Sequence, residues 1–321
     1  MTATQIAHGA EADVRSTQHL RRFAALSLFA ALYTFALVVF GGFVRITDSG
    51  MGCGDHWPKC NGRWIPEFTI PTLIEYTHRL LGVSIGLVLI GVFVYAFRRR
   101  REAGFGGRGG VLRIAALVLT LVVVQGLLGA VTVWLEIPPI VVVVHFATAL
   151  AIMGILLIGY VRGRELAGAT MRVADRNAHR YARIATIAAA IGFVVVVFGA
   201  LVANNLGAPQ ACQGFPLCNG SAMPSGGSLV HIHWTHRVVA FALFFYVLYG
   251  AIATRAASSV RVRTAAIAAA AAVVAQLVVA AALVLSHLPQ SLQGLHLAVG
   301  AAVWGVLVLW AGYARAEAAS Q

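Results

Sequence analysis

Residues 140–161 read IVVVVHFATALAIMGILLIGYV, with no Asp, Glu, Lys or Arg and a single histidine, His145, near the start. A run of about 20 apolar residues is long enough to cross the roughly 30 Å hydrocarbon core of a bilayer as a helix, and this run lacks the alternation of a barrel strand. Seven similar runs occupy residues 23–45, 76–97, 112–135, 181–203, 232–254, 263–286 and 291–313. Because 60% of the residues are hydrophobic and 11% charged, the composition also excludes a soluble globular domain. The sequence therefore predicts an all-α integral membrane protein with eight transmembrane helices.

The net charge of +13 is typical of nucleic-acid-binding proteins, but the positions of the basic residues indicate membrane topology instead. Most of the 24 Lys and Arg residues lie in the two terminal segments and in the connections after the second, fourth and sixth runs. The exceptions are Arg45, Lys59, Arg63, Arg79 and Arg237. The positive-inside rule then places both termini in the cytoplasm and the connections after odd-numbered runs outside the cell membrane. We expect the basic residues to contact membrane lipid, and no nucleic acid.

The chain repeats itself, because several short patterns recur in the same order and with the same spacing. The matched segments are Phe40-Gly41 with Phe198-Gly199, Trp57-Pro58-Lys59-Cys60-Asn61-Gly62 with Phe215-Pro216-Leu217-Cys218-Asn219-Gly220, Thr77-His78-Arg79 with Thr235-His236-Arg237, Gln125 with Gln276, and His145 with His296. Such a repeat predicts two tandem four-helix bundles. Since each copy holds an even number of helices, we expect pseudo-two-fold symmetry about an axis along the membrane normal.

The repeat and the charge pattern together predict the boundaries of the domains. We expect a cytoplasmic N-terminal tail at 1–22, a first bundle at 23–161, a cytoplasmic linker at 162–180, a second bundle at 181–313 and a cytoplasmic tail at 314–321. The linker is polar and basic and lacks an apolar pattern, which is why we place the division there.

All four cysteines lie in the two long connections that the topology places outside, where disulfides persist. A bridge within each connection is the simplest pairing, Cys53 with Cys60 and Cys212 with Cys218, although the sequence leaves pairing between the connections open. Zinc binding is the rival interpretation, but these spacings lack the close ligand pairs of structural zinc sites.

Four histidines lie near the outer ends of the even-numbered runs: His78, His145, His236 and His296. The second and fourth helices of an antiparallel bundle run in the same direction, so His78 can face His145, and His236 can face His296. Imidazole is a standard axial ligand of haem iron. A single histidine at a helix end more often makes an interfacial hydrogen bond, but two at matched positions in each half favour haem ligation.

Other polar residues near these histidines have two interpretations each. Glu75 lies three residues before His78 on the same helix face, and His233 takes its place in the second half. Glu75 is either a group that stabilises positive charge or moves a proton at a haem edge, or an ordinary acidic residue at a helix start. Three arginines either bind haem propionates or anchor helix ends: Arg45, Arg79 and Arg237.

Together these residues resemble the haem A synthase family, the CtaA and Cox15 group of bacteria and mitochondria, over nearly the whole membrane region. The resemblance is carried by Gly50-Met51-Gly52-Cys53, Trp57 to Gly62, Glu75-Tyr76-Thr77-His78-Arg79, His145, His236 and His296. The external cysteine pairs in both halves are similar to the bacterial type.

The resemblance implies oxidation of the C8 methyl group of haem O to a formyl group, by two hydroxylations and loss of water, to give haem A for terminal oxidases. It implies a haem b cofactor on His236 and His296, substrate haem O near His78 and His145, and Glu75 as the catalytic carboxylate. Haem O synthase would deliver the substrate. The electron partner, the oxygen source and the formation of a homo-oligomer stay open.

The same resemblance implies that Cys53 and Cys60 are redox-active and that Cys212 and Cys218 are structural. A purely structural disulfide stays open for both pairs.

A dihaem b-type cytochrome that passes electrons from quinol is the first rival function, because it would use the same four histidines. A membrane thiol oxidoreductase would use the cysteines but leaves the histidines unexplained, and a transporter fits the repeat but not the paired ligands.

Overall fold

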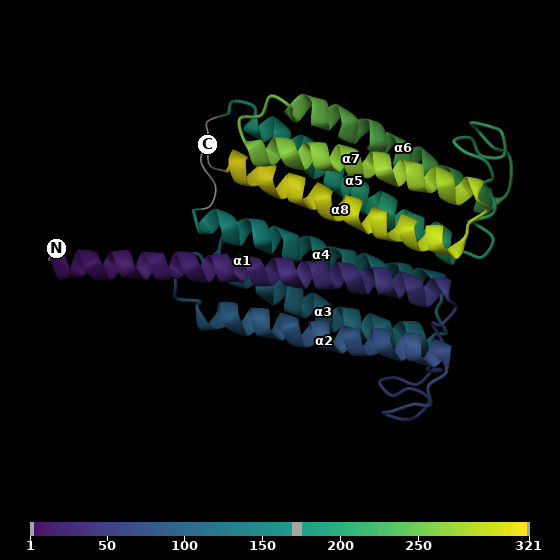
Figure 1. The fold of residues 1–321 in the computed structure, drawn as a ribbon, viewed down its shortest axis with the longest axis horizontal. Helices are drawn as coiled ribbons and strands as arrows, with labels where there is room; N and C mark the ends of the chain where they lie inside the picture. Colours follow the sequence, from purple (N-terminus) through teal and green to yellow (C-terminus); the bar gives the residue numbers. More distant parts are fainter. Residues whose placement is uncertain (1–2, 169–174, 320–321) are drawn as a thin grey trace.

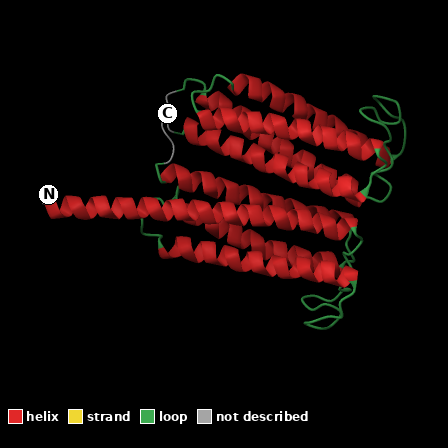
Figure 2. Cartoon of the chain, viewed as in Figure 1, coloured by secondary structure: helices red, strands yellow, loops and turns green. Residues whose placement is uncertain are grey.

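The computed structural model describes residues 3–168 and 175–319, with the backbone alone for residues 3–13. Every regular element in these ranges is a helix (Figures 1 and 2). The helices are α1 (Ala3–Ile46), α2 (Ile70–Arg98), α3 (Val111–Trp134), α4 (Pro139–Leu166), α5 (Ala178–Asn204), α6 (Ser228–Thr254), α7 (Val260–Leu285) and α8 (Gln290–Ala318). Each of the eight has a stretch long and apolar enough to cross a membrane, which confirms the predicted fold class.

Several helices continue past the apolar runs at the end of the molecule that carries the termini. Helix α1 begins within the predicted tail 1–22, and α8 ends within the predicted tail 314–321. The predicted linker 162–180 contains the last turn of α4 and the start of α5, and its residues 169–174 lie outside the described residues. Hydropathy indicates where a chain enters lipid, whereas Ala, Gln, Glu and Arg have high helix propensity and extend the helix into water.

The helices form two groups of four, and within each group the contacts close into a ring. Helix α1 packs on α2 and α4, and α3 packs on the same two helices; α5 and α7 likewise each pack on α6 and α8. The two groups meet through α4 and α8, with further contacts of α1 with α8 and of α4 with α5 (Figure 1). This arrangement agrees with the predicted pair of four-helix bundles, while the pseudo-two-fold axis stays a prediction.

The two groups approach closely at three levels along the helices, and a glycine makes each approach feasible. The glycine and the side chain that it faces are Gly42 with Leu297, Gly154 with Trp304, and Gly312 with Val161. A Cβ atom at Gly42 would lie 2.6 Å from Leu297, and one at Gly154 would lie 3.0 Å from the Trp304 ring. At the middle level, the Trp304 indole also donates a 3.1 Å hydrogen bond to the Leu150 carbonyl of α4. Small residues of this kind let membrane helices pack tightly.

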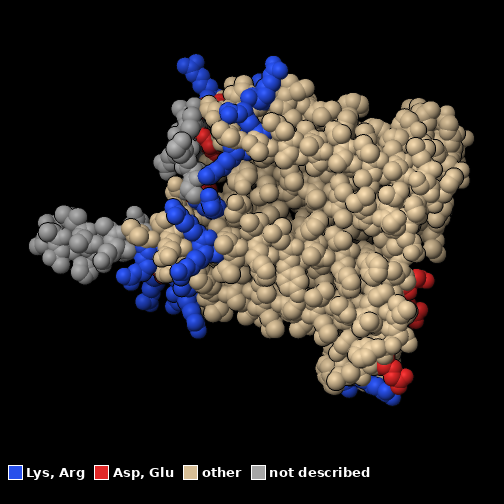
Figure 3. Space-filling view, viewed as in Figure 1, with Lys and Arg blue, Asp and Glu red and all other residues tan. Residues whose placement is uncertain are grey.

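The two ends of the molecule differ in charge and in loop length. Most Lys and Arg side chains visible in Figure 3 gather at the end where the N-terminus emerges. The two long connections, residues 47–69 and 205–227, lie at the opposite end, which we call the loop end. This distribution agrees with the positive-inside pattern, and the assignment of the loop end to the outside of the membrane stays a prediction.

Candidate active site

Each long connection is closed by its own disulfide. The bridges join Cys53 to Cys60 and Cys212 to Cys218, with sulfur atoms 1.99 Å apart in both. The predicted pairing within each connection is therefore confirmed, and no thiolate is left to bind zinc in the described part of the chain. All four cysteines are at most 1% exposed. Because thiol exchange needs access to sulfur, this burial argues against the thiol oxidoreductase interpretation.

An arginine from the first turns of α2 or α6 fastens each disulfide loop to its bundle. Arg79 Nη1 donates to the carbonyls of His56 and Lys59, at 2.7 and 2.8 Å. Arg237 Nη1 donates to the carbonyls of Gly214 and Leu217, also at 2.7 and 2.8 Å. The acceptors lie at the same sequence offsets from the two arginines, so the repeat extends to this contact. These bonds fit the interpretation of both arginines as anchors, and propionate binding stays a prediction for each.

Glu75 is buried, at 4% exposure, and both of its carboxylate oxygens have partners. Oε1 accepts from Arg79 Nε at 3.1 Å and from Arg79 Nη2 at 2.5 Å. Oε2 accepts a 2.8 Å bond from the backbone N–H of Cys53. The carboxylate, which belongs to α2, therefore contacts both the arginine that anchors the loop and the backbone of a disulfide cysteine.

His233, which replaces Glu75 in the second half, is also buried and also bonds to its loop. Its Nδ1 lies 2.9 Å from the carbonyl of Ala208, so Nδ1 carries the proton in this hydrogen bond. Arg237 Nη2 donates to the carbonyl of Cys212 at 2.5 Å, where Arg79 donates to a carboxylate. The second half therefore keeps the anchoring arginine but lacks its acidic partner.

The two histidines of the first half each pack against a glycine of a neighbouring helix. A Cβ atom at Gly41 would lie 3.1 Å from the His78 ring, and one at Gly129 would lie 3.3 Å from the His145 ring. Gln125 Nε2 is 3.1 Å from His145 Nε2, a contact between residues that lie 20 apart in the sequence. Nδ1 of both histidines is buried without a hydrogen-bond partner. An unpaired buried polar atom of this kind costs about 1–3 kcal/mol, which a ligand can offset.

The second half repeats this arrangement in part: His236 packs against a glycine as His78 does, and His296 contacts a glutamine as His145 does. A Cβ atom at Gly199 would lie 2.9 Å from the His236 ring, and His236 Nδ1 is buried without a partner. Gln276 Nε2 lies 3.1 Å from His296 Nδ1 and donates a bond of the same length to the His296 carbonyl. The amide oxygens of Gln125 and Gln276 are likewise unpaired and buried. Unpaired buried polar atoms therefore lie on both imidazoles and one amide in the first half, and on His236 and Gln276 in the second.

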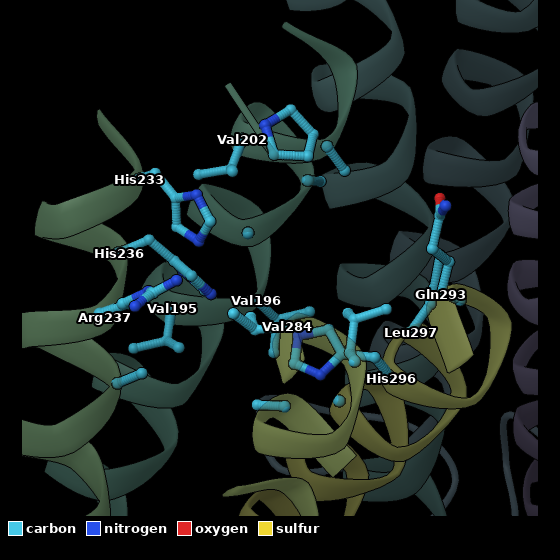
Figure 4. Close-up of a pocket in the computed structure, with 18 of the residues that line it drawn as sticks. Val195, Val196, Val202, His233, His236, Arg237, Val284, Gln293, His296 and Leu297 are labelled. Carbon is cyan, nitrogen blue, oxygen red and sulfur yellow. The ribbon is translucent and has the colours of Figure 1, made fainter. Parts of the chain in front are cut away.

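A cavity of about 420 Å³ lies mainly among the helices of the second half, and residues of the second long connection such as Leu206 and Phe215 also line it. Figure 4 shows His233 and His236 on one side of it, from α6, and His296 from α8 across from them. Apolar side chains such as Val195, Val284 and Leu297 form much of the wall. A mostly apolar cavity of this size with a few convergent polar groups is the usual form of a cofactor site.

Paired imidazoles are the candidate metal ligands. Across the described ranges, no group of three or more His, Cys, Asp or Glu residues could hold a free metal ion. An iron already held by four porphyrin nitrogens needs only one or two axial ligands from the protein, so a histidine pair suffices.

Some contacts at the site were not predicted from the sequence. The repeat matches Gln125 with Gln276 without indicating a chemical role for them, and their constant spacing from a histidine is the signal that points to these contacts. The contacts of Arg45 with Ala203 and Gln293 join the two halves, and no pattern in the sequence indicates them.

Comparison with known proteins gives the family. Residues 24–308 match the COX15-CtaA family, described as cytochrome oxidase assembly protein. The haem A synthase of Symbiobacterium thermophilum is 30% identical over 292 residues, covering 90% of this chain and 94% of that protein. The haem A synthase of Exiguobacterium sibiricum is 30% identical over 228 residues, covering 70% of this chain and 73% of that protein. The chain therefore belongs to the COX15-CtaA family of cytochrome oxidase assembly proteins, in which its relatives are haem A synthases.

Proposed function

We propose that this chain is a haem A synthase, a membrane oxidoreductase that oxidises the C8 methyl group of haem O to a formyl group. The observation that carries the proposal is the second-half cavity, with His236 and His296 on opposite walls. The proposal includes haem O delivery by haem O synthase, both termini in the cytoplasm, and the disulfide loops outside.

The residues of the second half fit a haem b cofactor. His236 offers an unpaired ring nitrogen, His296 faces it, and Gly199 leaves room for the His236 imidazole. The cavity walls are mostly apolar, which suits a porphyrin face. When bound, haem supplies reversible one-electron chemistry at its iron. His236 and His296 hold and orient the cofactor, and Gln276 fixes the orientation of the His296 ring through its amide.

The first half is the better candidate for the reaction because it alone has a buried acid beside its histidines. His78 and His145 would receive haem O, and each has a buried Nδ1 without a partner. Glu75 lies one helical turn before His78 and is held in place by Arg79 and by the N–H of Cys53. A carboxylate fixed in this way can stabilise positive charge that develops on the substrate, or accept a proton from it.

The test is chemical analysis of haems from cells that make haem O but lack any other haem A synthase. Expression of this chain should produce haem A, and the purified protein should carry a haem b that is lost in His236→Ala. Conversion should fail in Glu75→Ala while haem b stays bound. Unchanged haem O together with two haem b groups per chain would refute the proposal and support the dihaem b-type cytochrome.

A further inference from the structure

The second-half cavity carries positive charge without a matching acid. Arg45 and Arg237 both line it, and no Asp or Glu does. In the described part of the chain, the ion pairs involve other residues, and neither arginine lies within 4.0 Å of a carboxylate. In the first half, by contrast, the corresponding Arg79 pairs with Glu75. The second-half cavity therefore keeps two uncompensated cations.

Arg45 reaches this cavity from the other half of the molecule. It lies in the last turn of α1, and its side chain is half-buried at the loop end. Nη1 donates to the Ala203 carbonyl of α5 at 3.1 Å, and Nη2 lies 3.4 Å from Gln293 Oε1 of α8. Ala203 is the residue that matches Arg45 in the repeat, so the second half has no equivalent arginine to offer the first.

The two arginines differ in the number and length of the hydrogen bonds that their guanidinium groups donate. Arg237 donates three hydrogen bonds of 2.5 to 2.8 Å to loop carbonyls. Both of its Nη atoms therefore have acceptors, but these acceptors are neutral and do not balance the positive charge. Arg45 has only neutral acceptors, and the one on Gln293 is long. Burying a charge in apolar surroundings without an opposite charge is costly. A ligand carboxylate that replaces the Gln293 contact would remove that cost.

We propose that Arg45 of the first half binds a carboxylate of the ligand in the second-half cavity, with Arg237 supplying the second positive charge. The ligand class is a dicarboxylate with an apolar body, which describes a haem with two propionates. The inference rests on the proposed function, since it takes haem b as the occupant. A guanidinium forms strong, charge-assisted hydrogen bonds with a carboxylate. The site for the cofactor is then completed by α1, a helix of the substrate half.

The test uses the full-length protein purified with its haem. Arg45→Gln keeps an amide that can donate to Ala203 but removes the charge, whereas Arg45→Lys keeps the charge. Arg63→Gln is the matched control, because Arg63 is an exposed arginine of the first disulfide loop, paired with Glu67. The measurements are the haem content per chain and the one-electron midpoint potential of the second-half haem, identified by its loss in His236→Ala.

A positive charge near haem favours the reduced form, so Arg45→Gln should shift the one-electron equilibrium about tenfold toward the oxidised form. A tenfold change corresponds to a midpoint potential lower by about 59 mV. Arg45→Lys should stay near the parent value, and Arg63→Gln should be unchanged. If Arg45→Gln loses its haem, retention of haem and potential in Arg45→Lys still supports the inference.

Two results would overturn the inference and leave the proposed function intact. One is a parental potential and haem content in Arg45→Gln; the other is equal loss of haem in the Gln and Lys variants, which indicates a role in helix packing alone. Failure of the proposed function looks different, because the parent protein would then contain no haem that depends on His236 and His296.

Discussion

The buried ion pair of Glu75 and Arg79 gives the sharpest prediction, because it joins the candidate catalytic carboxylate to a disulfide loop. The pair is almost excluded from solvent, with side-chain exposures of 5% and 14%, and Glu75 also accepts a bond from Cys53 N–H. Removing one member of a buried pair costs about 3–5 kcal/mol. Glu75→Gln should therefore raise the equilibrium constant for local opening of the first loop by roughly 10²- to 4 × 10³-fold, since about 1.4 kcal/mol corresponds to a factor of ten.

Disulfide reduction reports this opening directly, because the cysteines are buried until the loop moves. The assay is brief treatment with a phosphine reductant, alkylation and mass spectrometry of the peptide that contains Cys53 and Cys60. The bridge between Cys212 and Cys218 is an internal control in the same molecule and should react at its parental rate. Glu67→Gln is the external control: its partner is Arg63, both side chains are at least 65% exposed, and exposed pairs contribute at most about 1 kcal/mol.

The same variant should also lose conversion of haem O, by about 10²- to 10⁴-fold for a group that moves a proton. A first loop that is no more reducible in Glu75→Gln than in the parent would refute the argument that the pair holds the loop. If the loop opens but haem O is converted at the parental rate, Glu75 holds the loop and takes no part in the oxidation of haem O.

Three further predictions concern the histidine pairs and the contact between the halves. His236→Ala and His296→Ala should each lose one haem per chain in a pyridine haemochrome assay, and full haem content in both would exclude this pair as ligands. Gly199→Ala should weaken haem binding because its Cβ would lie 2.9 Å from the His236 ring, whereas Gly82→Ala, which meets nothing within 4 Å, should leave the haem spectrum unchanged. An identical spectrum for the two alanine variants would show that the imidazole does not need the space at Gly199. Trp304→Phe should cost about 1 kcal/mol through loss of the bond to the Leu150 carbonyl, measured by thermal unfolding in detergent. An unchanged midpoint temperature would show that this bond does not stabilise the contact between the halves.

The fold was largely predictable because burial in lipid imposes a single simple pattern on each helix. The run at 140–161 corresponds to α4, and its histidine lies near the loop end as the topology requires. The extension of α1 back to Ala3 was not predictable from hydropathy, since polar residues with high helix propensity continue the helix beyond the apolar run.

The site was predictable only where it depends on one helix or on the repeat. The four-residue spacing of Glu75 and Arg79 is enough to expect their ion pair. The bond from Cys53 N–H to Glu75 depends on how the loop folds, and the contact of Arg45 with Gln293 spans 248 residues. Contacts of this kind follow from tertiary packing, which no local pattern encodes.

The three glycine contacts between the halves have a consequence for the distance between the two histidine pairs. Gly42 with Leu297, Gly154 with Trp304, and Gly312 with Val161 fix the halves to each other from the loop end to the opposite end. A rocking movement, which repeat-built transporters use, would have to break at least one of these contacts. The separation between the two histidine pairs is therefore expected to stay constant. If each pair holds a haem as proposed, the rate of any electron transfer between the two haems would be determined by the folded frame rather than by domain motion.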